Sequence, residues 1–470
     1  MNFVPIKTRP LAAGGVLLVG DGGDFALAQT PIVERLCMGG LADADCSALE
    51  REGLLIREHD RLGRIAHAHK LAGRVAGASS LDYLILVPTL RCNLNCSYCQ
   101  VSRVAERSTG FDWDDRTLAA VLDVIDGLQT DQIKIEFQGG EPTLRLDLIR
   151  AVIERCERFR LRQFVICTNL QRLDEDVLAL FDRPDVFVST SLDGDAETHA
   201  RQRTRNGATT DAFLANLQYV VGRYGPGKVS ALPTVDPMSL PDMDTLIDSF
   251  TAYGIHAVFL RPINYQGFAR KRHADVRELD TSWREYHAAF VRRLIERNWA
   301  DQSCVLEETY FSICLRRVFQ PAADRHVDLR DPNPIGVDYI VVDYDGRVYP
   351  TDEARMLTRS GIIDLGIGDV FDGWRSEACE RLNDHATNRF DPACQRCAYQ
   401  PFCGRDLIDD LSRYGTIDIP RHETEFCRRH LAIFDLIFDL IYSDDPAVSH
   451  SLARWLHLPG TPTDFGARLS

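Results

Sequence analysis

The stretch Pro88-Thr-Leu-Arg-Cys-Asn-Leu-Asn-Cys-Ser-Tyr-Cys-Gln100 decides how this sequence is interpreted, because it places three cysteines in one short loop. A 4Fe-4S cluster that is fully ligated by protein takes four thiolates. Cys92, Cys96 and Cys99 can therefore hold three corners of a cluster and leave one iron open for a substrate or cofactor. The loop follows the apolar run Tyr83–Val87, and barrel enzymes place their chemistry at the carboxyl ends of strands.

The pattern Cys-x3-Cys-x-aromatic-Cys resembles the signature of the radical S-adenosylmethionine (SAM) enzymes. The resemblance implies that the open iron is chelated by the amino and carboxylate groups of SAM. It also implies that SAM is cleaved to a 5′-deoxyadenosyl radical, which abstracts hydrogen from the substrate. Tyr98 matches the aromatic position, whose backbone lies near the adenine in relatives. A zinc site would need a fourth Cys or His nearby, and residues 100–110 contain neither.

Composition is that of a globular protein with several domains. The chain has 470 residues, of which 45% are hydrophobic and 26% are charged. No run of about 18 apolar residues and no signal-peptide core is present, so we expect a cytoplasmic protein. The net charge of −15 argues against nucleic acid as a partner. Fourteen cysteines then indicate metal ligation and buried thiols, not disulfides.

Strand and helix patterns alternate between residues 81 and 300. The strand candidates are continuous and apolar, as buried parallel strands are. They are Leu84–Val87, Ile133–Phe137, Phe164–Cys167, Val186–Thr190, Val229–Leu232 and Ala257–Leu260. Helical patterns lie between most of them, at Thr117–Leu128, Leu146–Arg158, Glu175–Phe181, Ala212–Tyr224 and Met243–Tyr253, and a helix at Ser282–Arg297 closes the domain. The fold class is therefore α/β. Six units are too few for a full barrel of ~250 residues, so residues 79–300 predict the partial (β/α)6 barrel of radical SAM enzymes.

Residues 1–78 form a separate unit in this interpretation. Gly15–Val19 and Phe25–Ala28 flank a glycine-rich turn and predict a hairpin, followed by two helices and a short strand at Leu54–Ile56. The order resembles the winged-helix-like peptide-recognition module of radical SAM enzymes that mature ribosomal peptides. The resemblance implies that a leader peptide adds a strand to the edge of the module's sheet. The alternative is an N-terminal cap without a ligand.

The segment Glu136-Phe-Gln-Gly-Gly-Glu-Pro-Thr143 follows the second strand. Glycines allow close approach of the backbone to a ligand, and a carboxylate can pair with an ammonium group. In radical SAM enzymes Gly-Gly-Glu-Pro binds the amino group of SAM, and Gly139, Gly140, Glu141 and Pro142 match that motif residue by residue.

Three further positions follow later strands. Asn169 ends the third strand, and Ser191 lies at the end of the fourth. Their polar side chains suit a ribose or a carboxylate, and the family resemblance implies that Ser191 faces the SAM ribose. His199 and Arg203 follow in the order His-x3-Arg, which peptide-modifying members share. The resemblance places Arg203 near the SAM carboxylate, whereas we expect His199 to be structural. The alternatives are strand capping for Asn169 and Ser191 and a solvated helix face for Arg203.

A second set of cysteines comprises Cys394, Cys397, Cys403 and Cys427, with spacings x2, x5 and x23. By chemistry alone, zinc and a closed 4Fe-4S cluster both fit four thiolates. The spacing resembles the outer auxiliary cluster of the SPASM domain, and that resemblance implies a cluster. Two cysteines of the full pattern are replaced, by Thr351 and Leu407. We therefore expect one auxiliary cluster, with Cys304, Cys314 and Cys379 as remote candidates for another, and we expect Cys156 and Cys167 to be core thiols.

The C-terminal part, residues 301–440, is predicted to be this SPASM-like domain. Residues 338–350 predict a hairpin of Ile340–Val342 and Arg347–Tyr349 with an Asp-Gly turn, and Leu431–Ile441 predicts a buried helix. Residues 441–470 are expected to be a tail whose last 20 residues are loosely held.

The resemblance to radical SAM enzymes covers about residues 80–430, and the Phe3–Ile6 opening together with the segment around Cys92 most resembles the His-Xaa-Ser system maturases. The resemblance implies modification of a ribosomally made precursor peptide, with flavodoxin or ferredoxin as electron donor. A sulfatase-maturase-like enzyme that forms formylglycine and a non-catalytic zinc adaptor are the alternatives. The sequence identifies no catalytic acid or base, no precursor and no bond type.

Overall fold

The computed structural model describes residues 2–12, 14–75, 80–99, 102–264, 266–267, 269–272, 280–320, 326, 329–375 and 377–469. Within these ranges no helix combines the length and the apolar character needed to cross a membrane. The end of the cysteine loop lies outside the described residues.

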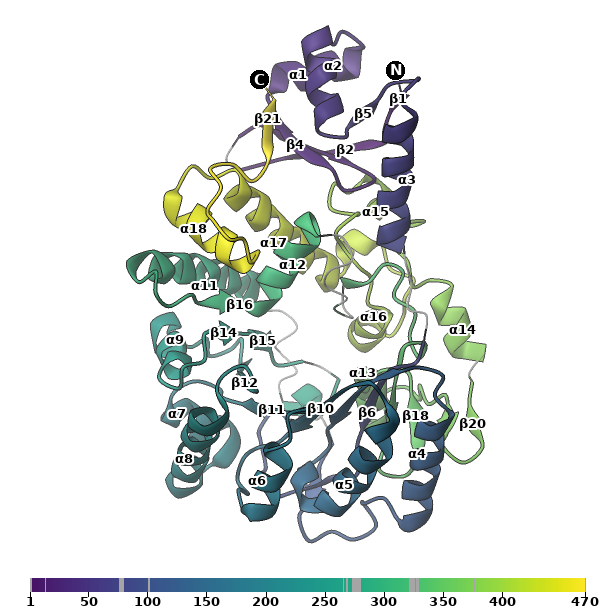
Figure 1. Cartoon of the computed structure of the whole chain (residues 1–470), viewed down its shortest axis with the longest axis vertical. Helices are drawn as coiled ribbons and strands as arrows, with labels where there is room; N and C mark the ends of the chain where they lie inside the picture. Colours follow the sequence, from purple (N-terminus) through teal and green to yellow (C-terminus); the bar gives the residue numbers. More distant parts are fainter. Residues whose placement is uncertain are drawn as a thin grey trace.

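A nine-stranded sheet forms the centre of the molecule, in the order β12-β11-β10-β9-β6-β17-β18-β19-β20 (Figure 1). Its first five strands are parallel, with Leu84 beside Ile135 and Phe164 beside Val186. These strands are β6 (Tyr83–Leu86), β9 (Gln132–Phe137), β10 (Leu161–Cys167), β11 (Val186–Ser191) and β12 (Val229–Leu232). All five lie where the apolar runs predicted them, because only a strand that is covered on both faces tolerates such a run.

Helices cover the outer face of this sheet. They are α4 (Asp115–Gly127), α5 (Leu146–Arg155), α6 (Glu175–Phe181), α7 (Ala196–His199), α8 (Gly207–Tyr224) and α9 (Met243–Thr251). Single-turn segments join them, namely η1 (Pro142–Arg145), η2 (Cys156–Arg158) and the π-helical η3 (Ala200–Thr204). Asp114, Asp174 and Asn206 accept hydrogen bonds from backbone N–H groups and so fix three helix starts.

The sixth unit contributes only short parallel pairs. β13 (Thr234–Val235) pairs with β15 (Arg261–Pro262), and β14 (Ala257–Val258) pairs with β16 (Glu307–Glu308). The sheet therefore stays open, and the expectation of a partial barrel is confirmed. Three small elements complete the region, β7 (Arg91–Cys92), β8 (Val104–Ala105) and α10 (Ala269–Arg272).

The C-terminal part joins the barrel through a shared sheet. β17 (Tyr339–Val342) lies parallel to β6 and forms the predicted hairpin with β18 (Arg347–Tyr349). β19 (Gly368–Asp369) and β20 (Gly373–Trp374) extend it. The helices are α11 (Asp280–Ala300), α12 (Thr309–Phe319), α13 (Asp352–Arg359), α14 (Glu377–Asn383), α15 (Pro392–Arg396), α16 (Leu407–Tyr414), η6 (Arg421–Glu423), α17 (Glu425–Ile441) and α18 (Pro446–Trp455).

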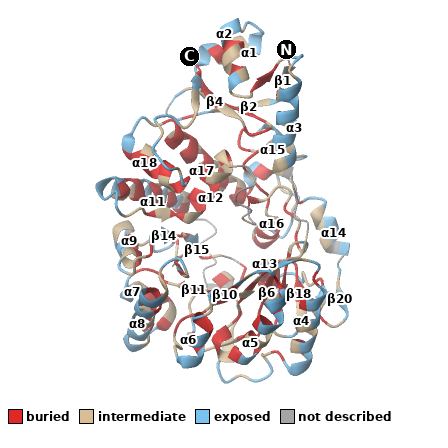
Figure 2. Ribbon diagram, viewed as in Figure 1, coloured by how far each residue is buried: buried red, intermediate tan, exposed pale blue. Residues whose placement is uncertain are grey.

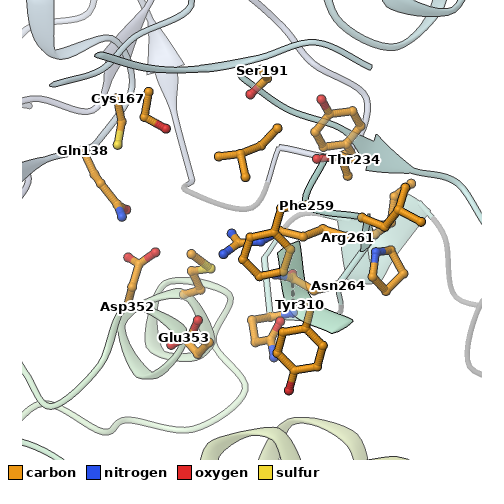
Figure 3. Close-up of a pocket in the computed structure, with 18 of the residues that line it drawn as sticks. Gln138, Cys167, Ser191, Thr234, Phe259, Arg261, Asn264, Tyr310, Asp352 and Glu353 are labelled. Atoms are coloured by element: carbon orange, nitrogen blue, oxygen red, sulfur yellow. Dashed lines mark hydrogen bonds between the residues drawn. The ribbon is translucent and has the colours of Figure 1, made fainter. Parts of the chain in front are cut away.

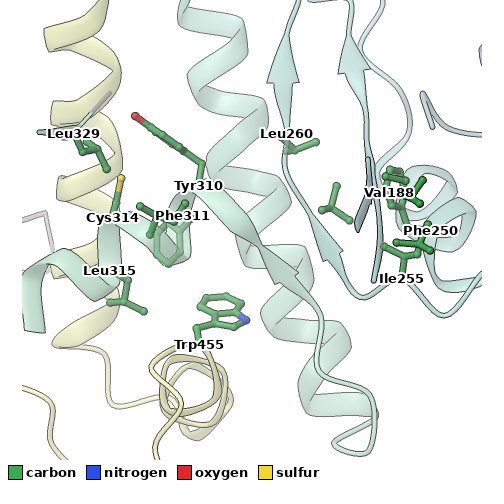
Figure 4. Packing of buried hydrophobic residues seen from close by; sticks show 14 of the residues in the cluster. Val188, Phe250, Ile255, Leu260, Tyr310, Phe311, Cys314, Leu315, Leu329 and Trp455 are labelled. Carbon is green, nitrogen blue, oxygen red and sulfur yellow. The ribbon is translucent and has the colours of Figure 1, made fainter. Parts of the chain in front are cut away.

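Helices α12, α17 and α18 pack into one apolar core with the barrel. Phe311 and Trp455 meet edge to face, with ring centroids 5.5 Å apart (Figure 4). Buried residues run along the central strands and through α12 and α17, whereas the outer faces of α4 and α8 are exposed (Figure 2). The burial predicted for Leu431–Ile441 is confirmed for most of its residues, because Ile433, Phe434 and Ile437 lie in this core.

The N-terminal module has a four-stranded sheet in the order β2-β3-β4-β21. The predicted hairpin is present as β3 (Val16–Gly20) and β4 (Phe25–Ala28), beside β2 (Ile6–Pro10). α1 (Thr30–Met38), α2 (Asp43–Arg51) and α3 (Arg61–Val75) accompany it, and β1 (Asn2–Phe3) pairs with β5 (Leu55–Ile56).

The outer strand of this sheet, β21 (Ala467–Leu469), comes from the far end of the sequence. It pairs with β4, and Leu469 is buried. The expectation that the last 20 residues are loosely held is therefore wrong for these three, and also for Ser451–Trp455, which end α18 in the core. A strand this short carries no periodicity that a sequence could reveal.

Candidate active site

One cavity of about 740 Å³ lies at the carboxyl ends of the parallel strands. The cysteine loop and the ends of β9, β10 and β11 line one side, and α13, α16 and α17 of the C-terminal part line the other. In the close-up, Asp352 and Glu353 lie across from Gln138 and Cys167 (Figure 3). Enzymes with α/β folds bind their ligands at this end of the sheet.

Cys92, Cys96 and Cys99 all line this cavity, as the sequence predicted. Burial raises the pKa of Cys92 to about 12, and the charges of Glu141, Cys96 and Cys99 add to the effect. Burial also raises the pKa of Cys96, against the opposing charge of Arg203. These three neighbouring thiols suit a metal-containing ligand. A thiol loses its proton when it binds a metal, and the positive charge of the metal then stabilises the thiolates. Their chemistry fits three corners of an iron–sulfur cluster.

Among the described residues, no three Cys, His, Asp or Glu side chains converge closely enough to surround a single metal ion.

Gly139 and Gly140 line the cavity and also lie against the backbone that leads into the cysteine loop. A Cβ on Gly140 would lie 2.1 Å from the carbonyl oxygen of Arg91, and one on Gly139 would lie 2.3 Å from that of Thr89. Backbone N–H groups cross the same gap, because Gly140 donates to Thr89 and Glu141 donates to Arg91. The glycines therefore position the cysteine loop as well as leaving room for a ligand.

The Glu141 carboxylate is buried beneath the cavity and is not part of its lining. Its Oε1 accepts from the N–H and hydroxyl of Thr143 and from the hydroxyl of Thr168, while Oε2 accepts from the N–H of Asn169 at 2.8 Å. Burial raises its pKa despite these bonds. Pro142 is buried too and does not line the cavity. Glu141 and Pro142 can therefore affect the cavity only through the residues that they contact.

Asn169 and Ser191 reach the cavity from the ends of β10 and β11. The Asn169 amide donates to Asn93 at 2.7 Å and contacts the Cys92 sulfur at 3.8 Å, which links the third strand to the cysteine loop. The adjacent Thr190 hydroxyl is buried in the cavity wall and has no hydrogen-bond partner among the residues that the structure describes. A buried hydroxyl without a partner is costly unless a ligand satisfies it, so this wall fits a polar ligand.

Arg203, Tyr98 and Asp193 form a buried network at the other end of the cysteine loop. Arg203 Nη1 donates to the Tyr98 hydroxyl at 2.7 Å, and that hydroxyl donates to Asp193 Oδ2 at 2.6 Å. The Thr234 N–H donates to Asp193 Oδ1 at 3.1 Å. Burial raises the pKa of Tyr98 well above its ordinary range, so the hydroxyl stays protonated and donates. Arg203 lies in the π-helical turn η3, a geometry that is common at functional sites.

Two residues of this region have roles that the sequence did not indicate. Asp193 belongs to the Ser191-Leu-Asp-Gly segment after the fourth strand, but no local pattern indicates that it pairs with Tyr98. Cys167 was expected to be a core thiol, and that expectation is wrong, because it lines the cavity and its Sγ donates to Glu136 at 3.3 Å. Cys156 is a core thiol, and His199 is structural, stacked on Phe213 with ring centroids 4.2 Å apart.

The second set of cysteines also gathers in space. Cys394 belongs to α15, Cys427 to the first turn of α17, and Cys397 and Cys403 to the loop between α15 and α16. Burial raises the pKa of Cys403 well above its ordinary range, and the charges of the other three cysteines add to it. Arg421 is buried against these thiols and forms an ion pair with Asp410. Four interacting thiols next to a buried cation fit an anionic cluster.

The two positions that lack the expected cysteines have structural roles. Thr351 caps α13 by accepting from the N–H of Ala354, and Leu407 is buried at the start of α16. Cys314 is buried in the core, and the Cys379 thiol donates to the Ile335 carbonyl.

The comparisons with known proteins agree with this geometry. Residues 86–249 match the model of the Radical SAM superfamily, and this part of the chain is a radical SAM domain. An uncharacterized protein of Methanocaldococcus jannaschii is 28% identical over 182 residues, which are 38% of this chain and 61% of that protein. A cysteine-type anaerobic sulfatase-maturating enzyme of Clostridium novyi is 28% identical over 155 residues, which are 31% of this chain and 41% of the enzyme. These matches span less than two thirds of either relative.

Solved structures share the fold over a longer region. The structure of anSMEcpe with bound AdoMet has a TM-score of 0.57 at 18% identity and covers 76% of this chain and 97% of its own. The same enzyme with AdoMet and a bound peptide has a TM-score of 0.58 at 16% identity, with the same coverage. At this identity the likeness establishes the fold.

Proposed function

We propose that this protein is a radical SAM maturase that modifies a ribosomally made precursor peptide through C–H functionalisation, such as a crosslink. The observation that carries the proposal is that Cys92, Cys96 and Cys99 share one cavity with the ends of three parallel strands. The opposite wall, formed by the C-terminal part, leaves a space that can admit a segment of peptide.

In this proposal Cys92, Cys96 and Cys99 would hold a 4Fe-4S cluster, and SAM would bind beside it in the cavity. When bound, the cluster and SAM together supply the one-electron cleavage that produces a 5′-deoxyadenosyl radical. Arg203 provides a buried positive charge for the SAM carboxylate, and Ser191 provides a hydroxyl for the ribose. Glu141 keeps Asn169 in place through the backbone, and the backbone of Gly139 and Gly140 borders the ligand.

The peptide substrate is supported by the relative with a bound peptide and by the N-terminal module. We propose that the module binds the leader of the precursor as an added strand. Cys394, Cys397, Cys403 and Cys427 would hold one auxiliary 4Fe-4S cluster. Flavodoxin or ferredoxin would deliver the electron in the cytoplasm, where thiols stay reduced.

The test is SAM cleavage by anaerobically reconstituted protein, measured as 5′-deoxyadenosine by chromatography. Wild-type protein should cleave SAM with dithionite, and Cys96→Ala should lose at least 99% of that activity. Cys37→Ala, which removes an exposed cysteine of α1, is the matched control and should keep it. Iron and sulfide should each be roughly eight atoms per chain for two clusters. Stoichiometric zinc with no cleavage would support the adaptor alternative and refute the proposal.

A second candidate is a sulfatase-maturase-like enzyme, because the relative from Clostridium novyi is a sulfatase-maturating enzyme. Incubation with a synthetic cysteine-containing peptide and SAM separates the two. Mass-spectrometric detection of formylglycine would favour this second function.

A further inference from the structure

The outer edge of the N-terminal sheet is filled by a distant segment of the same chain. β21 lies parallel to β4, with Ala467 beside Ala26 and Leu469 beside Ala28. The N–H of Gln29 donates to the Leu469 carbonyl at 3.0 Å. In Figure 1 this strand, near the end of the sequence, lies against the module formed by the first residues.

Side-chain contacts hold β21 on both of its faces. Leu469 is 6% exposed and belongs to the module's own apolar cluster, together with Leu18, Ala28 and Ile32. Arg468 points outward, where it donates to the Tyr442 carbonyl at 2.8 Å and to Asp444 at 2.7 Å. The Arg468 and Asp444 side chains are 44% and 89% exposed, so their ion pair adds little to the docking. Leu469, the partly buried Ala467, a few backbone hydrogen bonds and the bond from Arg468 to the Tyr442 carbonyl therefore hold this strand.

We propose that β21 is an internal competitor for peptide binding, so that the leader of a precursor displaces Ala467–Leu469 and pairs with β4. This inference rests on the proposed function, and it names the edge that the leader uses. The ligand is an extended segment with an aliphatic side chain at the position of Leu469. A basic residue at the position of Arg468 would face Asp444.

The other edge of the sheet is less suited to a peptide. β2 ends in Pro10, which has no N–H to donate to an added strand. Its Lys7 side chain donates to Gln400 at 2.8 Å, and Arg9 pairs with both oxygens of Asp435, so β2 is the strand that docks the module on the C-terminal part. The β4 edge, in contrast, already accepts a strand, which shows that its backbone groups and its side-chain pocket are complementary to an extended peptide.

A tethered competitor has a high effective concentration, in the millimolar range for short linkers. The intact chain should therefore bind a peptide at this edge more weakly than a chain whose β21 is released. Releasing β21 by substitution keeps the chain at full length and leaves the cavity unchanged.

The test compares Leu469→Glu with the matched control Thr463→Glu, which adds the same charge at an exposed position six residues earlier. Hydrogen exchange of the amides of Ala26–Gln29 should become at least tenfold faster in Leu469→Glu and stay unchanged in the control. The probe is a fluorescein-labelled synthetic peptide with the sequence of residues 460–469. It should bind Leu469→Glu at least tenfold more tightly than the wild-type chain or the control.

Unchanged exchange in Leu469→Glu, or equal peptide affinity in all three proteins, would overturn the proposal. Neither readout requires a cluster, SAM or a known precursor. Failure of SAM cleavage would therefore refute the proposed function while leaving these two measurements intact, and failure here would leave the radical chemistry unaffected.

Discussion

Arg203 donates a hydrogen bond of 2.7 Å to the hydroxyl of Tyr98, and its guanidinium lies 5.8 Å from the centre of the Tyr98 ring. Tyr98 stands between Cys96 and Cys99, whereas Arg203 follows the fourth parallel strand. The bond therefore connects the loop of the proposed cluster to the strand ends that line the rest of the cavity.

Replacing Tyr98 by Phe should weaken SAM binding by about tenfold. The ring stays in place, but Arg203 loses its acceptor and Asp193 loses a donor inside a buried site, where such a bond is worth about 1.5–3 kcal/mol. SAM titration of the reconstituted protein, followed by the change in the cluster's electron paramagnetic resonance signal, measures the affinity. Tyr219→Phe is the control, because Tyr219 also accepts from an arginine, Arg223, but on the surface. Equal SAM affinities of Tyr98→Phe and the wild type would contradict the proposal that the Tyr98–Arg203 bond orders the SAM site.

Replacing Gly140 by Ala should displace the cysteine loop. The new Cβ meets the backbone of Arg91 and Leu90, which cannot rotate away as a side chain can. We expect a loss of about 2 kcal/mol in unfolding free energy, typical of overpacking, together with a lower iron content after reconstitution. The control is Gly222→Ala, at an exposed position in the last turn of α8. The new Cβ there meets nothing within 4 Å, and the substitution should stabilise the protein by about 0.5–1 kcal/mol. Wild-type iron content in Gly140→Ala would refute the role of close backbone approach.

Replacing Cys427 by Ala should remove the auxiliary cluster and leave SAM cleavage in place. The expected loss is roughly four iron atoms per chain, measured by colorimetric iron analysis beside a 5′-deoxyadenosine assay. Cys304→Ala is the control, since Cys304 lies outside both cysteine sets and should not change the iron content. If Cys427→Ala kept all its iron, this cysteine would not be a ligand.

Replacing His199 by Phe should reduce the loss of unfolding free energy as the pH falls below about 6.5. Burial, helped by the charge of Arg203, lowers the pKa of His199 to about 3 in the folded chain. Because an unfolded histidine titrates near 6.5, the unfolded state gains a proton below that pH while the folded state does not. Stability is therefore present above pH 6.5 and is lost towards pH 3, by about 1.4 kcal/mol per pH unit.

Urea denaturation of apo-protein between pH 7 and pH 4.5 measures this slope. His199→Phe keeps the stack on Phe213 and should lose less stability than the wild type as the pH falls. The exposed His385 provides the control, and His385→Gln should follow the wild-type curve. A wild-type slope in His199→Phe would mean that His199 takes up its proton over the same pH range in the folded and unfolded chains.

The sequence predicted the parts of the fold that rest on continuous local patterns. The runs at Ile133–Phe137 and Val186–Thr190 became strands because both faces of the sheet are covered. Helix α3 was missed, since Arg61–Val75 is rich in basic residues and histidine and has a weak apolar stripe. The sixth strand was predicted as a full strand, but its backbone pairs only over the short β14 and β15.

The candidate site was predicted where one motif carries both position and chemistry, as in the cysteine loop and the two glycines. Contacts between distant segments had no local signal. The Arg9–Asp435 ion pair, for example, spans 426 positions, and nothing in either segment specifies the other. Asp193 shows the same limit, because its role depends on Tyr98, which lies 95 positions earlier.

The strand β17 has a practical consequence for dividing this protein into fragments. It fills the side of β6 that faces away from β9, with Ile340 beside Leu84 and Val342 beside Leu86. A fragment that stopped at residue 300 would contain every residue proposed to contact SAM, yet it would expose that flank of β6 as an unpaired apolar edge open to aggregation. A fragment that is to keep β6 paired must therefore extend at least through the hairpin to Tyr349.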